Sequence, residues 1–144
     1  MGPLVSGELL SLPVRSHGIE LGRPVELVLD LRARRVLGFE VRCRDGIHRF
    51  LPLAATRIRG DEITIESALT MLDELAFYRA RGRTLGSLRG AAVANAGGAL
   101  GTFRDVVFEP GGAIHELVVA TPGGERRVAP SGDVRIAARR ASAA

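Results

Sequence analysis

Three histidines and one cysteine are the residues of this chain best suited to metal binding or nucleophilic chemistry. The histidines are His17, His48 and His115, and no two of them have the spacing of a zinc motif. Cys43 would need a neighbouring base and an orienting group to act as a nucleophile, and no sequence signature supplies them. It falls on the apolar side of a strand-like run, where we expect a buried, inert thiol. We therefore expect no catalytic residue, no metal site and no cofactor, and we interpret the chain as a protein that is not an enzyme.

The surroundings of the histidines favour structural positions. His48 follows the turn signal Asp45-Gly46, so we expect it on the surface. His115 begins a strand-like run and is expected in the core or at the rim of a barrel.

Acidic residues recur at matched positions along the chain. These are Glu26, Asp30, Asp105 and Glu109. Paired carboxylates could hold calcium or exchange protons, but no segment has the spacing of a calcium loop. Polar positions that alternate on the solvated face of a strand explain them better. The Gly-rich stretch 96–101 precedes a strand and contains no Lys, so it predicts a turn and not a phosphate loop.

Arginine supplies all the positive side chains, because the sequence has 20 Lys and Arg together and none of them is Lys. The pI of about 10.8 is compatible with RNA binding. A genome that replaces Lys codons by Arg codons explains the high pI better, since Arg does not deprotonate and so raises the pI even at a modest net charge. The candidate contacts with a partner or with RNA are Arg32, Arg34 and Arg35 in a turn, and Arg79, Arg81 and Arg83 after a helix.

Exposed aromatic residues are the second requirement of a single-strand RNA surface. We expect Phe39, Phe50 and Phe108 in the core. Only Phe77, Tyr78 and Phe103 then remain as candidate stacking residues, so this half of the RNA signal is weak.

An internal repeat gives the strongest information about the fold. Residues 21–30 match residues 100–109 in their glycine, acidic and apolar positions, with Gly22 aligned on Gly101. We call the distance along the sequence from Gly22 to Gly101 the repeat separation. A single deletion in the turn that follows shortens this separation by one for the rest of the repeat. The positions that define the repeat are Gly22, Asp30 and Pro52 in the first copy, and Gly101, Glu109 and Pro130 in the second.

Hydrophobic residues alternate with polar ones inside each copy, as in the runs 25–32 and 36–43. This period of two is typical of strands with one face in a core and one face in water. Asp45-Gly46 is a favourable two-residue hairpin turn. Several short strands at this spacing predict an all-β fold, either a small barrel or a sandwich.

One segment, 68–81, departs from this pattern because its apolar residues have helical spacing. Ser67 suits the N-cap and Gly82 suits the position after the last turn. We predict a short α-helix that joins the copies. The expected organisation is a first repeat at 1–66, a helical linker at 67–84, a second repeat at 85–137 and a flexible tail at 138–144.

The matched segments resemble the PRC-barrel family, a small β-barrel named from the photosynthetic reaction-centre H subunit and also found in a ribosome maturation factor. The resembling segments are 21–22, 28–30, 36–41 and 50–53 in the first copy, and 100–101, 107–109, 112–119 and 128–130 in the second. The resemblance implies two tandem small barrels joined by the helix, packed as a pseudo-twofold pair or exchanging edge strands. It implies no single function, because the family includes RNA-processing, photosynthetic and cell-division proteins.

From these observations we expect a non-catalytic binding module, an adaptor that engages a protein partner through a barrel edge or the linker helix. Formation of a homodimer stays open. The alternative is an RNA- or ribosome-associated maturation factor that uses its arginine-rich surface. No signal peptide is recognisable, and no run approaches the roughly 20 apolar residues of a membrane span. We expect a cytoplasmic protein without membrane insertion.

Overall fold

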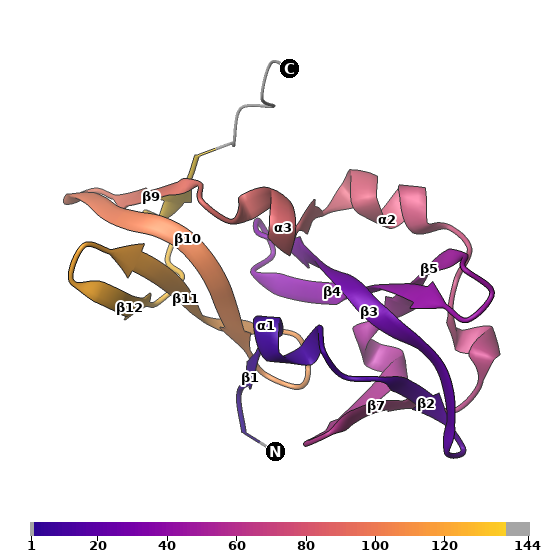
Figure 1. The fold of residues 1–144 in the computed structure, drawn as a ribbon. Coiled ribbons are helices and arrows are strands. Elements are labelled where there is room, and N and C mark those ends of the chain that lie inside the picture. The colour runs from indigo at the N-terminus through magenta and orange to yellow at the C-terminus, as the bar shows by residue number, and fades with distance from the viewer. Residues whose placement is uncertain (1, 138–144) are drawn as a thin grey trace.

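The computed structural model describes residues 2–137 of the chain, which form two β-sheets accompanied by short helices (Figure 1). The first sheet has the strand order β5-β4-β3-β2-β7-β6. Its strands are β2 (Val14–Ser16), β3 (Ile19–Asp30), β4 (Arg35–Cys43), β5 (His48–Pro52), β6 (Thr56–Arg59) and β7 (Glu62–Ile65). The second sheet has the order β12-β11-β10-β9-β13. Its strands are β9 (Ala92–Asn95), β10 (Gly98–Phe108), β11 (Ile114–Thr121), β12 (Gly124–Val128) and β13 (Arg135–Ile136). The expectation of a mostly β chain is confirmed.

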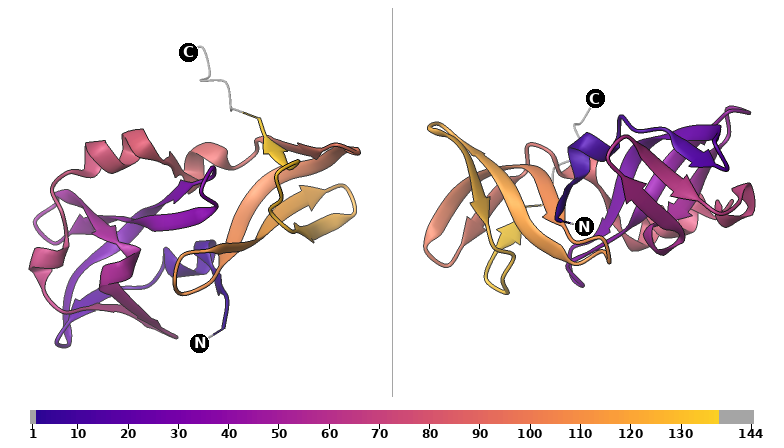
Figure 2. Two further views of the ribbon diagram at one scale, coloured as in Figure 1. Left: turned by 180° about the vertical axis from the view of Figure 1, so that it is seen from behind. Right: turned by 90° about the horizontal axis from the view of Figure 1, so that it is seen from below.

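Two strand–helix units stand at matched places in the two halves. The first is β1 (Leu4–Val5) with α1 (Ser6–Leu9), and the second, one repeat separation later, is β8 (Arg83–Thr84) with α3 (Leu85–Leu88). Each unit pairs with the sheet of the other half: β1 lies antiparallel to β10, and β8 lies antiparallel to β3. In Figure 2 the N-terminal segment accordingly lies between the two sheets. Each sheet is therefore completed by a short strand from another part of the chain: β1 joins the second sheet, and β8, which lies in the predicted linker 67–84, joins the first.

The turns of the two long hairpins also meet. The Val36 N–H donates to the Gly112 carbonyl over 2.8 Å, and the Ile114 N–H donates to the Arg34 carbonyl over 2.9 Å. Val36 matches Ile114 in the sequence repeat, and at the same offset Arg34 matches Gly112. The contact between the halves is therefore nearly symmetric.

Buried side chains of both sheets belong to one hydrophobic cluster. Leu27 and Phe39 of the first sheet, and Phe103 and Phe108 of the second, are all fully buried. Leu85 of the exchanged helix α3 is equally buried. The two halves thus share one hydrophobic cluster, which helps such short repeats to bury a core.

The predicted single helix over 68–81 is wrong. The chain instead forms a 3-10 turn, η2 (Ala68–Thr70), then an extended stretch, and then α2 (Leu75–Arg81). Ser67 caps the 3-10 turn, with its hydroxyl accepting from the Leu69 N–H. The break occurs because Leu72 pairs with Phe50 of β5 through two backbone hydrogen bonds, which a helical residue could not form. A second short 3-10 turn, η1 (Leu53–Ala55), follows β5.

Val25 and Glu40 differ from the alternation of buried and exposed residues read in the sequence. Val25 is 44% exposed, because a bulge between Pro24 and Glu26 shifts the register of β3. Glu40 is buried, although its alternation with apolar residues placed it on a solvated face. Pro130 lies after the end of β12, whereas Pro52 is the last residue of β5. The predicted tail at 138–144 lies outside the described residues.

Candidate functional site

The outer face of the first sheet is covered by α2. Tyr78 of α2 stacks on Phe50 of β5, with ring centroids 3.8 Å apart. Arg79 of the same helix forms an ion pair with the buried Glu40 of β4, 2.9 Å from its Oε1 atom. That oxygen accepts no hydrogen bond from the described residues, so the Arg79 contact is electrostatic. The second carboxylate oxygen of Glu40 lies 2.6 Å from Nδ1 of His48. The stacked rings of Phe50 and Tyr78 and the ion pair of Arg79 with Glu40 therefore cover this face of the sheet.

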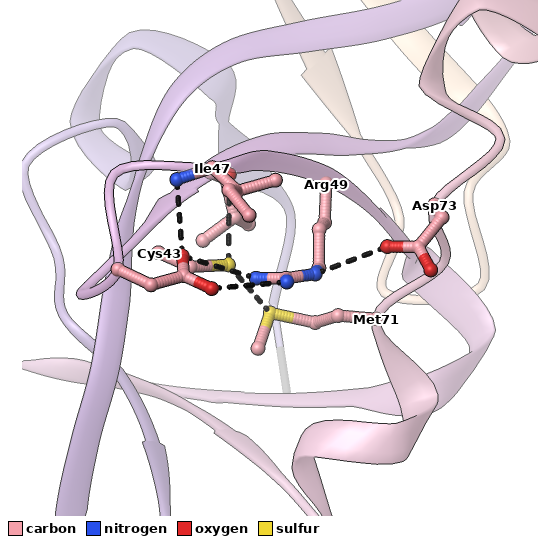
Figure 3. Close-up of polar contacts among 7 residues, drawn as sticks. Cys43, Ile47, Arg49, Met71 and Asp73 are labelled. Atoms are coloured by element: carbon pink, nitrogen blue, oxygen red, sulfur yellow. Dashed lines mark hydrogen bonds and ion pairs between the residues drawn. The ribbon is translucent and has the colours of Figure 1, made fainter.

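The edge of the first sheet is occupied as well. The Phe50 N–H donates to the Leu72 carbonyl over 2.9 Å, and the Leu72 N–H donates to the Phe50 carbonyl over 2.7 Å. On the next residue pair, Arg49 donates from Nε to Asp73 over 3.1 Å (Figure 3). The stretch before α2 therefore acts as a short added strand along β5, held by a backbone pair and by an ion pair.

Arg49 also binds the turn between β4 and β5. Its two terminal nitrogens donate to both carboxylate oxygens of Asp45, over 3.2 and 3.0 Å. These side-chain hydrogen bonds hold the pKa of the Asp45 carboxyl below its ordinary value, and they raise the pKa of Arg49. Arg49 is therefore a cation with two acidic partners at the end of the sheet.

Cys43 lies beside this cluster as a buried free thiol, which agrees with its sequence-based placement. Its Sγ atom is 3.8 Å from Sδ of Met71 (Figure 3). The contact anchors the chain just before the added strand.

The equivalent face of the second sheet carries no such cover in the described part of the chain. Strand register identifies the matching positions: Glu26 is opposite Glu40 in the first sheet, and Asp105 is opposite Val118 in the second. An open groove of about 790 Å³ runs over this face. Its walls carry charges of both signs, from Glu8 of α1, Asp105, Glu125, Arg89, Arg104 and Arg127. We call this surface the open face.

The repeated acids Glu26 and Asp105 have a structural task that the sequence did not reveal. Glu26 accepts from the Gly86 N–H over 3.1 Å, and Asp105 accepts from the Gly7 N–H over 3.0 Å. Each acid therefore holds the exchanged helix that comes from the other half. The expectation that these acids sit on freely solvated strand faces is wrong, since both are half-buried at this contact.

The other repeated acids do not share one task. Asp30 accepts from the Ala33 N–H over 3.0 Å inside the β3–β4 turn. Glu109 lies beside His115, with its Oε1 atom 3.5 Å from Nδ1 of the imidazole. His115 itself is exposed, so its predicted place in the core is wrong.

Most of the arginines singled out in the sequence contact other residues of the chain, either between the two halves or on α2. Arg34 reaches the Pro130 carbonyl and Arg35 donates to the Gly111 carbonyl, so both join the halves. Arg79 pairs with Glu40, and Arg81 lies over the Phe77 ring, 5.2 Å from its centroid. Arg32 is exposed in the β3–β4 turn, and Arg83 lies opposite Leu29.

The aromatic residues expected in the core, Phe39, Phe50 and Phe108, are buried. Of the three candidate stacking residues, Phe103 is fully buried and Tyr78 is stacked on Phe50. Phe77 is 52% exposed, and Arg81 lies against its ring.

Sequence reasoning missed Glu40, the exchanged units and the open face. A signal for the exchange was present, since Gly7, Leu9 and Val14 recur as Gly86, Leu88 and Val93 at the repeat separation. The burial of Glu40 had no comparable signal, because it depends on α2 folding back over β4.

Within residues 2–137 no three His, Cys, Asp or Glu side chains gather as a set that could hold a metal ion. Over the same residues no helix is both long enough and apolar enough to cross a bilayer. Comparison of the chain with models of protein families gives no match, and neither does comparison with curated proteins.

Proposed function

We propose that the chain is a non-catalytic adaptor of the PRC-barrel type, made of two tandem units of that kind, which binds a protein partner in the cytoplasm through the open face and edge of its second sheet. The observation that carries the proposal is the difference between two equivalent surfaces. In the first half, the chain's own added strand and α2 occupy the sheet edge and the outer face. In the second half, the same surfaces have no such occupant among the described residues.

The family part of the proposal rests on where the repeat motifs fall. Gly22 and Gly101 occupy one register position in the two sheets, since each pairs with a valine of the preceding strand, Val14 or Val93. The acids at the end of the matched segments, Asp30 and Glu109, both stand where the long strand enters its turn. This order of glycine, strand and acid is the part of the pattern that resembles the family.

The arginine-rich surface gives the RNA alternative less support than the open face gives the adaptor. Arg34, Arg35 and Arg79 are occupied by contacts inside the chain. Single-strand RNA surfaces combine free cations with exposed aromatic platforms. Phe77 would have to supply that platform while Arg81 lies on its ring.

The test is affinity capture from a lysate of the source organism, with the full chain as bait and washes at low and then high salt. The proposal predicts a discrete protein that remains at high salt. Arg104→Glu, which reverses a charge in the open face, is expected to reduce its capture, whereas Arg57→Glu on β6 makes the same charge change elsewhere and is expected to leave it unchanged. Capture of RNA or ribosomal proteins that high salt removes would instead support the RNA-associated function.

A further inference from the structure

The edge strand of the second sheet, β12, offers unused backbone hydrogen-bonding groups. In the described residues β12 pairs with β11 on one side and with no strand on the other. Thr121 and Gly124 close the two-residue hairpin between them. Hydrogen-bonded and non-hydrogen-bonded pairs alternate along an antiparallel ladder. Glu125 and Arg127 therefore direct their N–H and C=O groups away from β11, to the open side.

The first half shows what such an edge can hold. Arg127 is opposite Val118, as Phe50 is opposite Glu40. Phe50 uses its outward N–H and C=O to bind Leu72. By register, Arg127 presents the same pair of groups to a strand that would lie where the Leu72 stretch lies in the first half.

The neighbouring side chain adds a chemical preference. Arg126 is opposite the fully buried Val119, as Arg49 is opposite the fully buried Val41. Arg49 binds Asp73 of the added strand. Arg126 is exposed, and it has no ion pair or hydrogen bond with any described side chain.

We propose that β12 binds an extended segment of a protein partner by antiparallel strand addition, with an apolar residue opposite Arg127 and, one residue further on, an aspartate or glutamate opposite Arg126. This inference rests on the proposed function and names the chemistry of the partner. Charged edge strands discourage indiscriminate pairing. Adjacent arginines on β12 would reject basic or purely apolar strands and accept an acidic one. The chain's own residues 138–144 contain two arginines and no acid, so they lack this chemistry.

The probe is a synthetic peptide with the sequence of residues 68–76, which contains the Leu72–Asp73 pair. It is titrated into the isotope-labelled full chain, and backbone amide shifts are followed by NMR. We expect saturable shifts centred on residues 124–128. Arg126→Glu should weaken binding about fivefold, the upper end for an exposed ion pair. A peptide in which Asp73 is replaced by Arg should then bind Arg126→Glu better than it binds the wild-type chain.

A matched pair of variants isolates the backbone contribution. Arg127→Pro removes the outward N–H while leaving the ladder to β11 intact, as proline is tolerated on an open edge. It should weaken the peptide roughly tenfold relative to Arg127→Ala, the effect of one lost hydrogen bond. Equal affinity of these two variants, or shifts confined to residues outside β12, would overturn the inference. Shifts at β12 that depend on chain concentration without peptide would also overturn it, since a second copy would then hold the edge.

Lysate capture separates this failure from failure of the adaptor function. A partner that the wild-type chain and Arg127→Pro retain equally would leave the adaptor standing and remove β12 as its site. Absence of any protein partner would refute the adaptor itself.

Discussion

Gly22 and Gly101 lie where the long strands β3 and β10 leave no room for a side chain beside the neighbouring strand. A Cβ at Gly22 would meet the Arg42 carbonyl at 2.5 Å, and one at Gly101 would collide with the matching carbonyl of Ala120. Gly101 in addition has a φ of 141°, which side-chain-bearing residues rarely adopt. Each half therefore needs a glycine at this matched position, because a side chain there would collide with the neighbouring strand.

Replacement of either glycine by alanine should lower the free energy of unfolding. We expect about 1–3 kcal/mol for Gly22→Ala, the usual cost of overpacking, and a larger loss for Gly101→Ala because of its φ. Denaturant unfolding measures both. Gly60→Ala is the control, since nothing lies within 4 Å of a Cβ there. Equal stability of all three variants would contradict the close approach.

Arg79 balances the buried carboxylate of Glu40, so its removal should be felt even though Arg79 is itself half-exposed. Arg79→Gln should cost about 1–3 kcal/mol of unfolding free energy, because Glu40 then keeps only His48 as a polar partner. Arg81→Gln, on the same helix, should change it by less than about 0.5 kcal/mol. In a double-mutant cycle, Glu40→Gln should recover part of the loss, and strictly additive effects would refute the pairing.

The Asp45–Arg49 contact predicts a dependence on pH. Because the pKa of Asp45 is lowered in the fold, its contribution to stability is present above the ordinary carboxyl pKa of about 3.9 and is lost as the pH falls through the lowered value. Asp45→Asn should therefore be less stable than the wild type at neutral pH, and the difference should narrow below about pH 4. Asp61→Asn, at an exposed turn position, should show no such narrowing. A constant difference across this range would contradict the assignment.

At the scale of elements, the exchanged units tie the two halves together through one repeated contact. Asp105 holds α1 and Glu26 holds α3, each through a glycine N–H in the first turn of the helix. The two acids occupy matched positions of the repeat and belong to opposite sheets. Substitution of the acid in one half should therefore destabilise the short helix that comes from the other half of the sequence.

Amide hydrogen exchange can test this crossed relation with a matched pair of variants. Asp105→Ala should accelerate exchange at Gly7 and leave Gly86 unchanged, while Glu26→Ala should do the reverse. Each should cost about 0.5–2 kcal/mol, the usual range for a lost helix cap. If each variant accelerates amide exchange at Gly7 and Gly86 equally, the assignment of one acid to each helix is wrong.

The elements that sequence patterns predicted well are those governed by local alternation. The runs around Leu27 and Phe39 became strands, although Val28 and Glu40 on their second face are buried as well. Asp45-Gly46 lies in the turn between β4 and β5, which spans residues 44–47 and is longer than the predicted two-residue turn. The helix at 68–81 failed because its middle is extended by pairing with β5, a contact between Phe50 and Leu72 that are well separated in sequence. Propensity reports local preference, and a distant strand overrode it here.

The candidate site could be predicted only in part for the same reason. The sequence marked Arg32, Arg34 and Arg35 by their clustering, yet two of these three hold the halves together. It gave no sign of Arg126, whose significance comes from its register on β12. Strand pairing across the whole sheet decides which arginine side chain lacks an acidic partner. The order of charged residues along the chain does not reveal that pairing.

At the scale of the whole molecule, the chain consists of two similar halves that exchange short strand–helix units and differ in their outer surfaces. In the first half, the added strand and α2 follow β7 in the chain and cover the β5 edge and the outer face of the sheet. The second half reaches β13 directly and keeps both open in the described residues. The exchanged units thus connect the two copies, and the difference between the copies leaves open the surface that we propose for a partner.

The most direct test of this account is amide hydrogen exchange at Phe50 and Arg127 in the free full chain, because the two residues occupy matching positions on β5 and β12. The Phe50 amide, which is bonded to Leu72, should exchange slowly, and the Arg127 amide should exchange at nearly the rate of an unprotected residue. Slow exchange at Arg127 comparable to that at Phe50 would show that the second edge is already covered, and it would contradict the central claim that this edge is free for a partner.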